Sequence, residues 1–84
     1  MTDRARVGVL PIQEVVANAS PSAWRDGLVI AVEPGATTVA LLDGTVCDLT
    51  TSVSPALGEP VAVHPVADLL AVAGTWYAAR PLSA

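Results

Sequence analysis

The sequence predicts an all-β domain, a small five-stranded barrel of the OB-like or SH3-like kind, with an extended N-terminal arm and a short C-terminal tail. Short runs rich in Val, Thr and Leu recur between closely spaced turn signals, which is typical of a compact barrel. No segment between residues 24 and 75 has clean helical spacing. A closed barrel would also remove the exposed edges that make a Val-rich sheet prone to aggregation.

Residues 1–23 are expected to form the N-terminal arm. Gly8 and Pro11 argue against a long helix that starts early, although the pattern allows a short helical turn over residues 13–18. The apolar side chains of this segment follow no regular period, which indicates an arm that packs onto something. Three interpretations stay open: the arm packs on a partner, it adds an edge strand to its own barrel, or it is disordered.

Residues 24–75 are expected to form the barrel, and residues 76–84 an apolar, irregular tail. Asp43-Gly44 predicts a hairpin with a type I′ turn, because both central residues of that turn need positive φ. For the last predicted strand, a short helix is the rival interpretation. The predicted strands are residues 28–32, 37–42, 45–50, 61–65 and 69–73.

The composition favours burial against other chains. The chain has 84 residues, of which 52% are hydrophobic and only 14% charged. A domain of about 60 ordered residues buries only roughly 60% of the surface that its unfolded chain exposes. Cys47 is the single cysteine, so no disulfide can compensate. We therefore expect contact with protein subunits of the same assembly, in a homo-oligomer or multicopy arrangement.

Charge and hydropathy exclude two classes of partner. The net charge is −4 and the chain has no lysine, whereas a nucleic-acid binder needs a basic stripe. No apolar stretch reaches the ~20 residues of a transmembrane helix. Asp3, Pro11 and Gln13 interrupt the start of the chain too early for a signal peptide, so a cytoplasmic origin is expected. The scattered cations are Arg4, Arg6, Arg25 and Arg80.

No catalytic, cofactor or metal motif is present in the sequence. His64 is expected at the surface or in an interface, at the end of a strand, and Cys47 is expected to pack as a small apolar group beside Leu49. These two are also the only soft metal ligands. The carboxylates lie mostly in turns, where they serve solvation and turn geometry. The prediction is therefore a protein that is not an enzyme and needs no cofactor or metal.

The aromatic residues are the best candidates for contact anchors. Trp24, Trp76 and Tyr77 flank the predicted barrel core, where they would either anchor an interface or plug the ends of their own barrel. Together with the apolar residues of the arm and tail they make up the predicted interface: Val9, Leu10, Ile12, Val15, Val16, Trp24, Trp76, Tyr77 and Leu82.

The stretch from Gly27 to Thr75 resembles small OB-like domains in virion proteins of tailed phages that infect actinobacteria. The pattern is carried by a first strand, a hairpin around Asp43-Gly44, a Pro-containing linker, alternating valines and an apolar strand that ends in Gly-Thr. The resemblance implies a structural part of a virion, either a head decoration protein or a tail protein. The departures from the pattern are Pro60, His64, Pro65 and the long N-terminal arm.

The predicted function is therefore a non-catalytic structural subunit of a multisubunit particle. It would dock on its neighbours through two apolar ends, residues 7–16 and 76–82. The alternative is a small regulatory or ligand-binding barrel attached to a larger protein machine. The expected location is the virion if the resemblance holds, and the cytoplasm otherwise.

Overall fold

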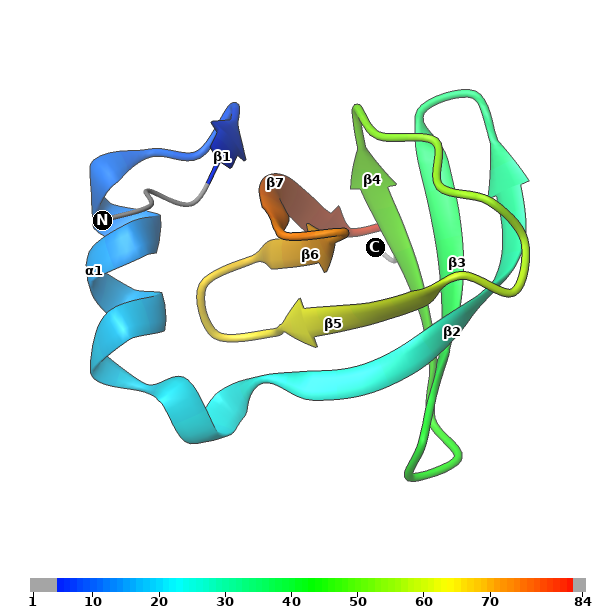
Figure 1. Ribbon diagram of the computed structural model, residues 1–84, viewed down its shortest axis with the longest axis horizontal. Helices are drawn as coiled ribbons and strands as arrows, with labels where there is room; N and C mark the ends of the chain where they lie inside the picture. The colour runs from blue at the N-terminus through cyan, green and yellow to red at the C-terminus, as the bar shows by residue number, and fades with distance from the viewer. Residues whose placement is uncertain (1–4, 83–84) are drawn as a thin grey trace.

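The computed structural model describes residues 5–82, which form one α-helix, one short 3-10 helix and seven strands (Figure 1). In chain order these are β1 (Ala5–Val7), α1 (Pro11–Ala19), η1 (Pro21–Ala23), β2 (Arg25–Glu33), β3 (Ala36–Leu41), β4 (Val46–Thr51), β5 (Pro60–His64), β6 (Leu69–Val72) and β7 (Thr75–Pro81).

Six of the strands close into an antiparallel barrel. Their order around the ring is β7-β4-β3-β2-β5-β6, and the pairing of β6 with β7 completes it. β1 is an additional strand, parallel to the first half of β7, whereas β4 pairs with the second half. The all-β barrel is thus confirmed, but the expected number of five strands is one too few.

The missing strand is β7, which occupies most of the segment predicted to be an irregular tail. Its side chains alternate in the usual way for a strand: Tyr77 and Ala79 pack in the barrel, while Trp76 packs on the outside. Because both faces are covered, apolar residues occupy both and the alternation does not show in the sequence. Leu69 and Leu70 in β6 follow the same rule, so the helical interpretation of residues 69–73 is also wrong.

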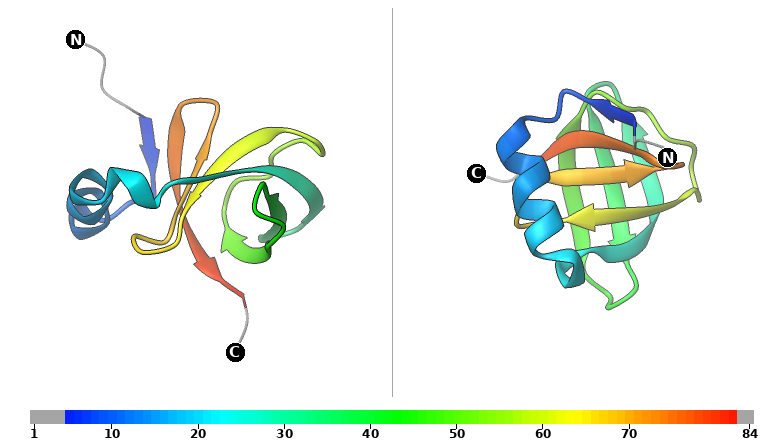
Figure 2. Two further views of the ribbon diagram at one scale, coloured as in Figure 1. Left: turned by 90° about the horizontal axis from the view of Figure 1, so that it is seen from below. Right: turned by 60° about the vertical axis from the view of Figure 1, so that its left-hand side comes forward.

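The N-terminal arm is more ordered than predicted. It contains α1, which runs for nine residues from Pro11, instead of an extended segment with a short turn. Pro11 begins the helix because the first helical position needs no backbone N–H and suits the fixed φ of proline. Figure 2 shows α1 lying across one side of the barrel.

Two separate cores result from this arrangement. The barrel interior holds residues from the six paired strands, and a second core lies between α1 and the outer face of β6 and β7. The buried residues of the first are Val29, Val39, Leu41, Leu49, Val61, Val63, Leu70, Val72 and Ala79; those of the second are Ala17, Ala67, Leu69 and Trp76.

The predicted β3–β4 hairpin is present, but its turn is of another type. Gly44 has φ 92, while Asp43 does not have positive φ. Leu42 and Asp43 take the central positions of the turn, and the N–H of Gly44 donates to the carbonyl of Leu41 at 3.0 Å. This is the three-residue loop in which a left-handed glycine follows a type I turn.

Positive φ at both central positions occurs instead between β6 and β7, at Ala73 (φ 51) and Gly74 (φ 83). A left-handed alanine costs about 1–2 kcal/mol, whereas asparagine tolerates this region. We expect Ala73→Asn to raise the free energy of unfolding by about 1 kcal/mol, measured by urea denaturation. Ala56→Asn is the control, because Ala56 is exposed and does not have positive φ. Equal effects of the two changes would contradict the strained turn.

Within residues 5–82, two threonine hydroxyls are buried without a hydrogen-bond partner, those of Thr37 and Thr51. Such a group costs about 1–3 kcal/mol to bury. Thr37→Val keeps the shape and removes the hydroxyl, so we expect it to stabilise the fold by about 1 kcal/mol. Thr38→Val is the matched control, because the Thr38 hydroxyl donates to Asp48 Oδ1 at 2.7 Å. A loss of thermal stability in Thr37→Val would indicate that the hydroxyl has a partner.

Candidate interaction surface

Gln13 fixes α1 on the barrel. Its Nε2 donates to the carbonyls of Ala67 and Asp68, at 3.0 and 3.1 Å, in the turn between β5 and β6. Its Oε1 accepts the N–H of Leu10 at 2.8 Å, which satisfies one of the free donors at the helix start. No role was predicted for Gln13 from the sequence. A Gln at the third helical position is the signal that could have suggested the contact at the helix start.

His64 is the second fixed point, and its expected place at the surface is wrong. The side chain lies at the end of β5, but it is fully buried, with 0% of its surface exposed. Nε2 lies 2.9 Å from the carbonyl oxygen of Ser20, and Nδ1 accepts the N–H of Ala67 at 3.1 Å. These partners assign the neutral tautomer with the proton on Nε2. Burial is tolerated because both ring nitrogens have backbone partners.

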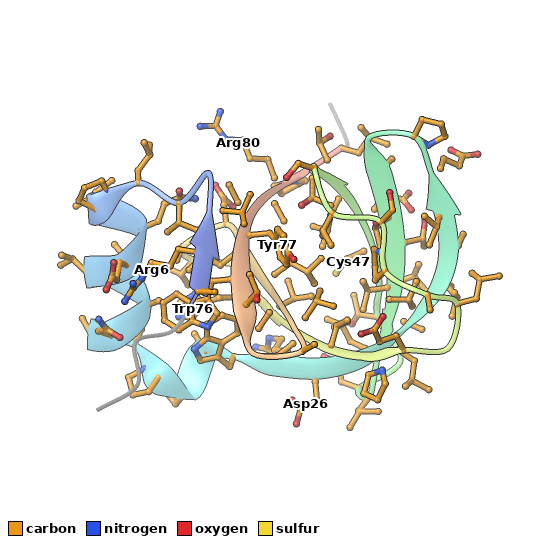
Figure 3. The ribbon with its side chains drawn as sticks, turned by 45° about the horizontal axis from the view of Figure 1, so that its top comes forward. Arg6, Asp26, Cys47, Trp76, Tyr77 and Arg80 are labelled. Atoms are coloured by element: carbon orange, nitrogen blue, oxygen red, sulfur yellow. The ribbon has the colours of Figure 1, made fainter. Side chains whose placement is uncertain are left out.

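The predicted aromatic anchors lie inside the molecule. Trp24 and Trp76 lie together beneath α1, with ring centroids 5.2 Å apart, and not at the two ends of the barrel. Trp24 also contacts the His64 ring edge-on at 5.0 Å. Figure 3 shows Trp76 on the side of β7 near α1, whereas Tyr77 lies among the side chains of the barrel.

The remaining predicted interface residues divide into two groups. Val9 and Val16 pack against the second core and therefore belong to the protein's own fold. Ile12 and Val15 lie on the opposite side of α1, with 62% and 60% of their surface exposed. Leu10 and Leu82 are exposed as well. The structure thus places one face of the arm on its own barrel and leaves the other face open.

A groove lies between the start of α1 and the β5–β6 turn, with a volume of about 230 Å³. The two sides of the groove, α1 and the turn, are held together by Gln13, Val16 and Ala67. We call this hollow the helix groove; its outer residues are Leu10, Ile12, Val66, Asp68 and Arg80. The three apolar members are all at least half exposed, so the groove is a preformed apolar depression with two charges beside it.

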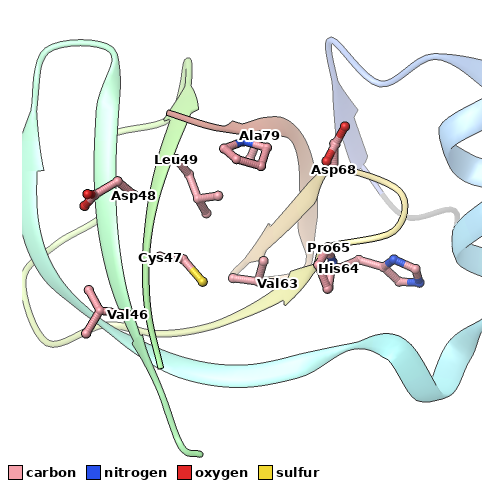
Figure 4. Close-up of a pocket in the computed structure, with 10 residues that line it drawn as sticks. Val46, Cys47, Asp48, Leu49, Val63, His64, Pro65, Asp68 and Ala79 are labelled. Carbon is pink, nitrogen blue, oxygen red and sulfur yellow. The ribbon is translucent and has the colours of Figure 1, made fainter. Parts of the chain in front are cut away.

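A second hollow of about 280 Å³ opens at the mouth of the barrel (Figure 4). Its walls include Cys47, Leu49 and Val63, and Figure 4 shows the Cys47 thiol directed toward Val63. The His64 ring points away from this hollow, and its nitrogens are occupied by backbone groups. Asp48 likewise points away and accepts from Thr38. Cys47, His64 and Asp48 are therefore not assembled into a nucleophile, base and acid.

In the described part of the chain, residues 5–82, no three His, Cys, Asp or Glu side chains are grouped so that they could hold a metal ion. The same residues include no helix long and apolar enough to cross a bilayer. Comparisons with family models, curated proteins and solved structures found no match.

Proposed function

We propose that this chain is a non-catalytic structural subunit that docks on neighbouring protein subunits of a multicopy assembly. The observation that carries the proposal is the two-sided apolar character of α1. Val16 and Ala17 hold the inner face of the helix on the barrel, yet Ile12 and Val15 on the outer face are also apolar and exposed. A surface helix is normally polar on its outer side, so exposed Ile and Val side chains there support a contact with another chain.

Burial of apolar area is the binding mechanism that fits this surface. Covering one Ile or Val side chain contributes roughly 1.5–3 kcal/mol. The charge of Glu14 on this helix is already satisfied within the chain, because Arg6 of β1 pairs with it at 2.6 Å. The apolar part of binding through α1 is therefore expected to depend little on salt. Repetition over many copies would make weak single contacts persistent.

The resemblance to OB-like virion domains makes the proposal more specific. It supports a component of a phage virion, in the head as a decoration protein or in the tail, built on an OB-like or SH3-like barrel. A closed barrel with a thin core and no exposed long strand edge suits a rigid part that is incorporated in many copies.

The double variant Ile12→Asp, Val15→Asp tests the docking function. Both side chains are more than half exposed, so we expect the thermal unfolding midpoint to change little. In cells that produce the protein naturally, a tagged wild-type chain should sediment with large assemblies in a density gradient, and the double variant should stay at the top. Leu57→Asp is the control, since Leu57 is equally exposed but lies outside α1. A wild-type chain that never leaves the light fractions would refute the proposal.

The alternative function, a regulatory or ligand-binding barrel, would use the hollow at the barrel mouth. Its walls are mainly apolar and Asp68 lies at its edge, so a small apolar amine is the matching ligand class. Titration with butylamine, followed by the amide NMR signals of Cys47 and Leu49, tests this alternative. Saturable shifts of both signals would favour it, and unchanged spectra would eliminate it.

A further inference from the structure

The tip of the β3–β4 hairpin carries the most exposed large apolar side chain among residues 5–82. Leu42 has 76% of its surface exposed, and the hairpin extends beyond the rest of the barrel (Figure 1). The tip is held rigidly, since the N–H of Leu42 donates to the carbonyl of Asp26 at 3.0 Å. A preformed protrusion loses little conformational entropy when it binds.

Asp43 places a carboxylate directly beside this leucine. Its Oδ1 accepts the N–H of Thr45 at 2.9 Å, and Arg25 lies 3.7 Å away. The hydrogen bond from the Thr45 backbone is the main reason why the pKa of Asp43 is lowered, and Arg25 adds to it. The tip therefore presents an apolar group next to a fixed negative charge.

The helix groove has the complementary character. Leu10, Ile12 and Val66 surround an apolar hollow of about 230 Å³, which is large enough for one leucine side chain. Arg80 lies beside the hollow and makes no ion pair with an acid among the described residues. Figure 3 shows it extending outward from β7. The groove therefore offers an apolar pocket next to an available positive charge.

The hairpin tip cannot reach the groove of its own chain. Figures 1 and 2 show α1 at one side of the molecule and the hairpin tip at another, separated by the barrel. A contact between these two surfaces must therefore join different copies. Because the two surfaces differ, the contact is head-to-tail, and it produces rings or open filaments instead of a closed symmetric pair.

We infer that a second copy of this chain fills the helix groove with Leu42 of its β3–β4 hairpin, while its Asp43 pairs with Arg80. The inference rests on the proposed docking function and names the partner. In this contact Asp43, which lies 3.7 Å from Arg25 of its own chain, would meet the positive charge of Arg80, in a groove that also contains Asp68.

Two variants with opposite defects test the contact by sedimentation velocity of the purified chain. Leu42→Asp removes the protruding group, and Ile12→Asp places a charge at the groove. We expect the wild-type chain to form species heavier than 8.5 kDa in proportions that rise with concentration. Each variant alone should sediment as a single chain. Mixed in equal amounts, they should form a pair and nothing larger, because only one intact tip and one intact groove remain.

The ion pair is tested separately. Asp43→Asn keeps an oxygen that can accept the Thr45 N–H but removes the charge, and Arg80→Gln removes the opposite charge. Each change should weaken self-association several-fold. The double variant should be no weaker than either single variant, since both changes remove the same pair. Leu57→Asp, on an exposed leucine outside both surfaces, should assemble like the wild type.

Three outcomes would overturn the inference. The wild-type chain remains a single chain at millimolar concentration; the two variants self-associate as the wild type does; or the mixture of the variants stays entirely as single chains. None of these affects the density-gradient result in producing cells, so the docking function is judged independently. If the groove variant alone also leaves the heavy gradient fractions while the purified wild type is a single chain, a different protein occupies the groove.

Discussion

Trp76→Ala is expected to lower the free energy of unfolding by about 3–5 kcal/mol and to release α1 from the barrel. Only 5% of the Trp76 surface is exposed, and its ring lies against Trp24 and the inner face of the helix. A domain of this length has a total stability of roughly 4–13 kcal/mol, so the loss takes a large share. Urea denaturation measures the loss, and hydrogen exchange reports on α1.

The neighbouring residue provides the control. Tyr77→Phe removes one hydroxyl from a partly buried ring on the other face of the same strand, and we expect it to change stability by less than about 1 kcal/mol. If the amides of α1 kept their protection in Trp76→Ala, the second core would not be what holds the helix on the barrel.

His64→Ala is expected to cost a similar amount, about 3–5 kcal/mol, for a different reason. The change leaves the Ser20 carbonyl and the Ala67 N–H without their partner in a buried site, and it removes the ring that contacts Trp24. An orphaned buried polar group costs about 1–3 kcal/mol, and the cavity adds to this. Equilibrium denaturation by urea measures the effect.

A less drastic substitution distinguishes lost hydrogen bonds from lost volume. His64→Gln can keep one of the two hydrogen bonds and should fall between wild type and His64→Ala. A double variant of His64 and Trp76 should lose less than the sum of the single losses, because both residues act through the second core. If His64→Ala had the same free energy of unfolding as the wild type, the imidazole would not be what links Ser20 to the β5–β6 turn.

The sequence predicted the features that depend on neighbouring residues. The β3–β4 hairpin follows from Asp43-Gly44, and even its different turn type uses the same glycine. The strand β7 was missed because Trp76 and Tyr77 serve opposite faces that are both buried. Pro11 was taken to oppose an early helix, whereas it is the first residue of one.

The candidate surface depended on contacts between residues far apart in the chain. Gln13 meets Ala67 across 54 positions, and His64 meets Ser20 across 44, so no local pattern identifies either contact. The sequence grouped the apolar residues of the arm together as one predicted interface. Which of them remain exposed follows only from where those two contacts fix the helix, and this is why Ile12 and Val16 could not be told apart.

Strands β6 and β7 each belong to both cores. β7 contributes Ala79 to the barrel interior and Trp76 to the space beneath α1, and it pairs with β1, β4 and β6. Among the described strands β7 comes last in the chain, although its parallel partner β1 comes first. The barrel cannot close, and β1 cannot pair, until β7 is in place. Both halves of the molecule should therefore fold together, in a single cooperative transition.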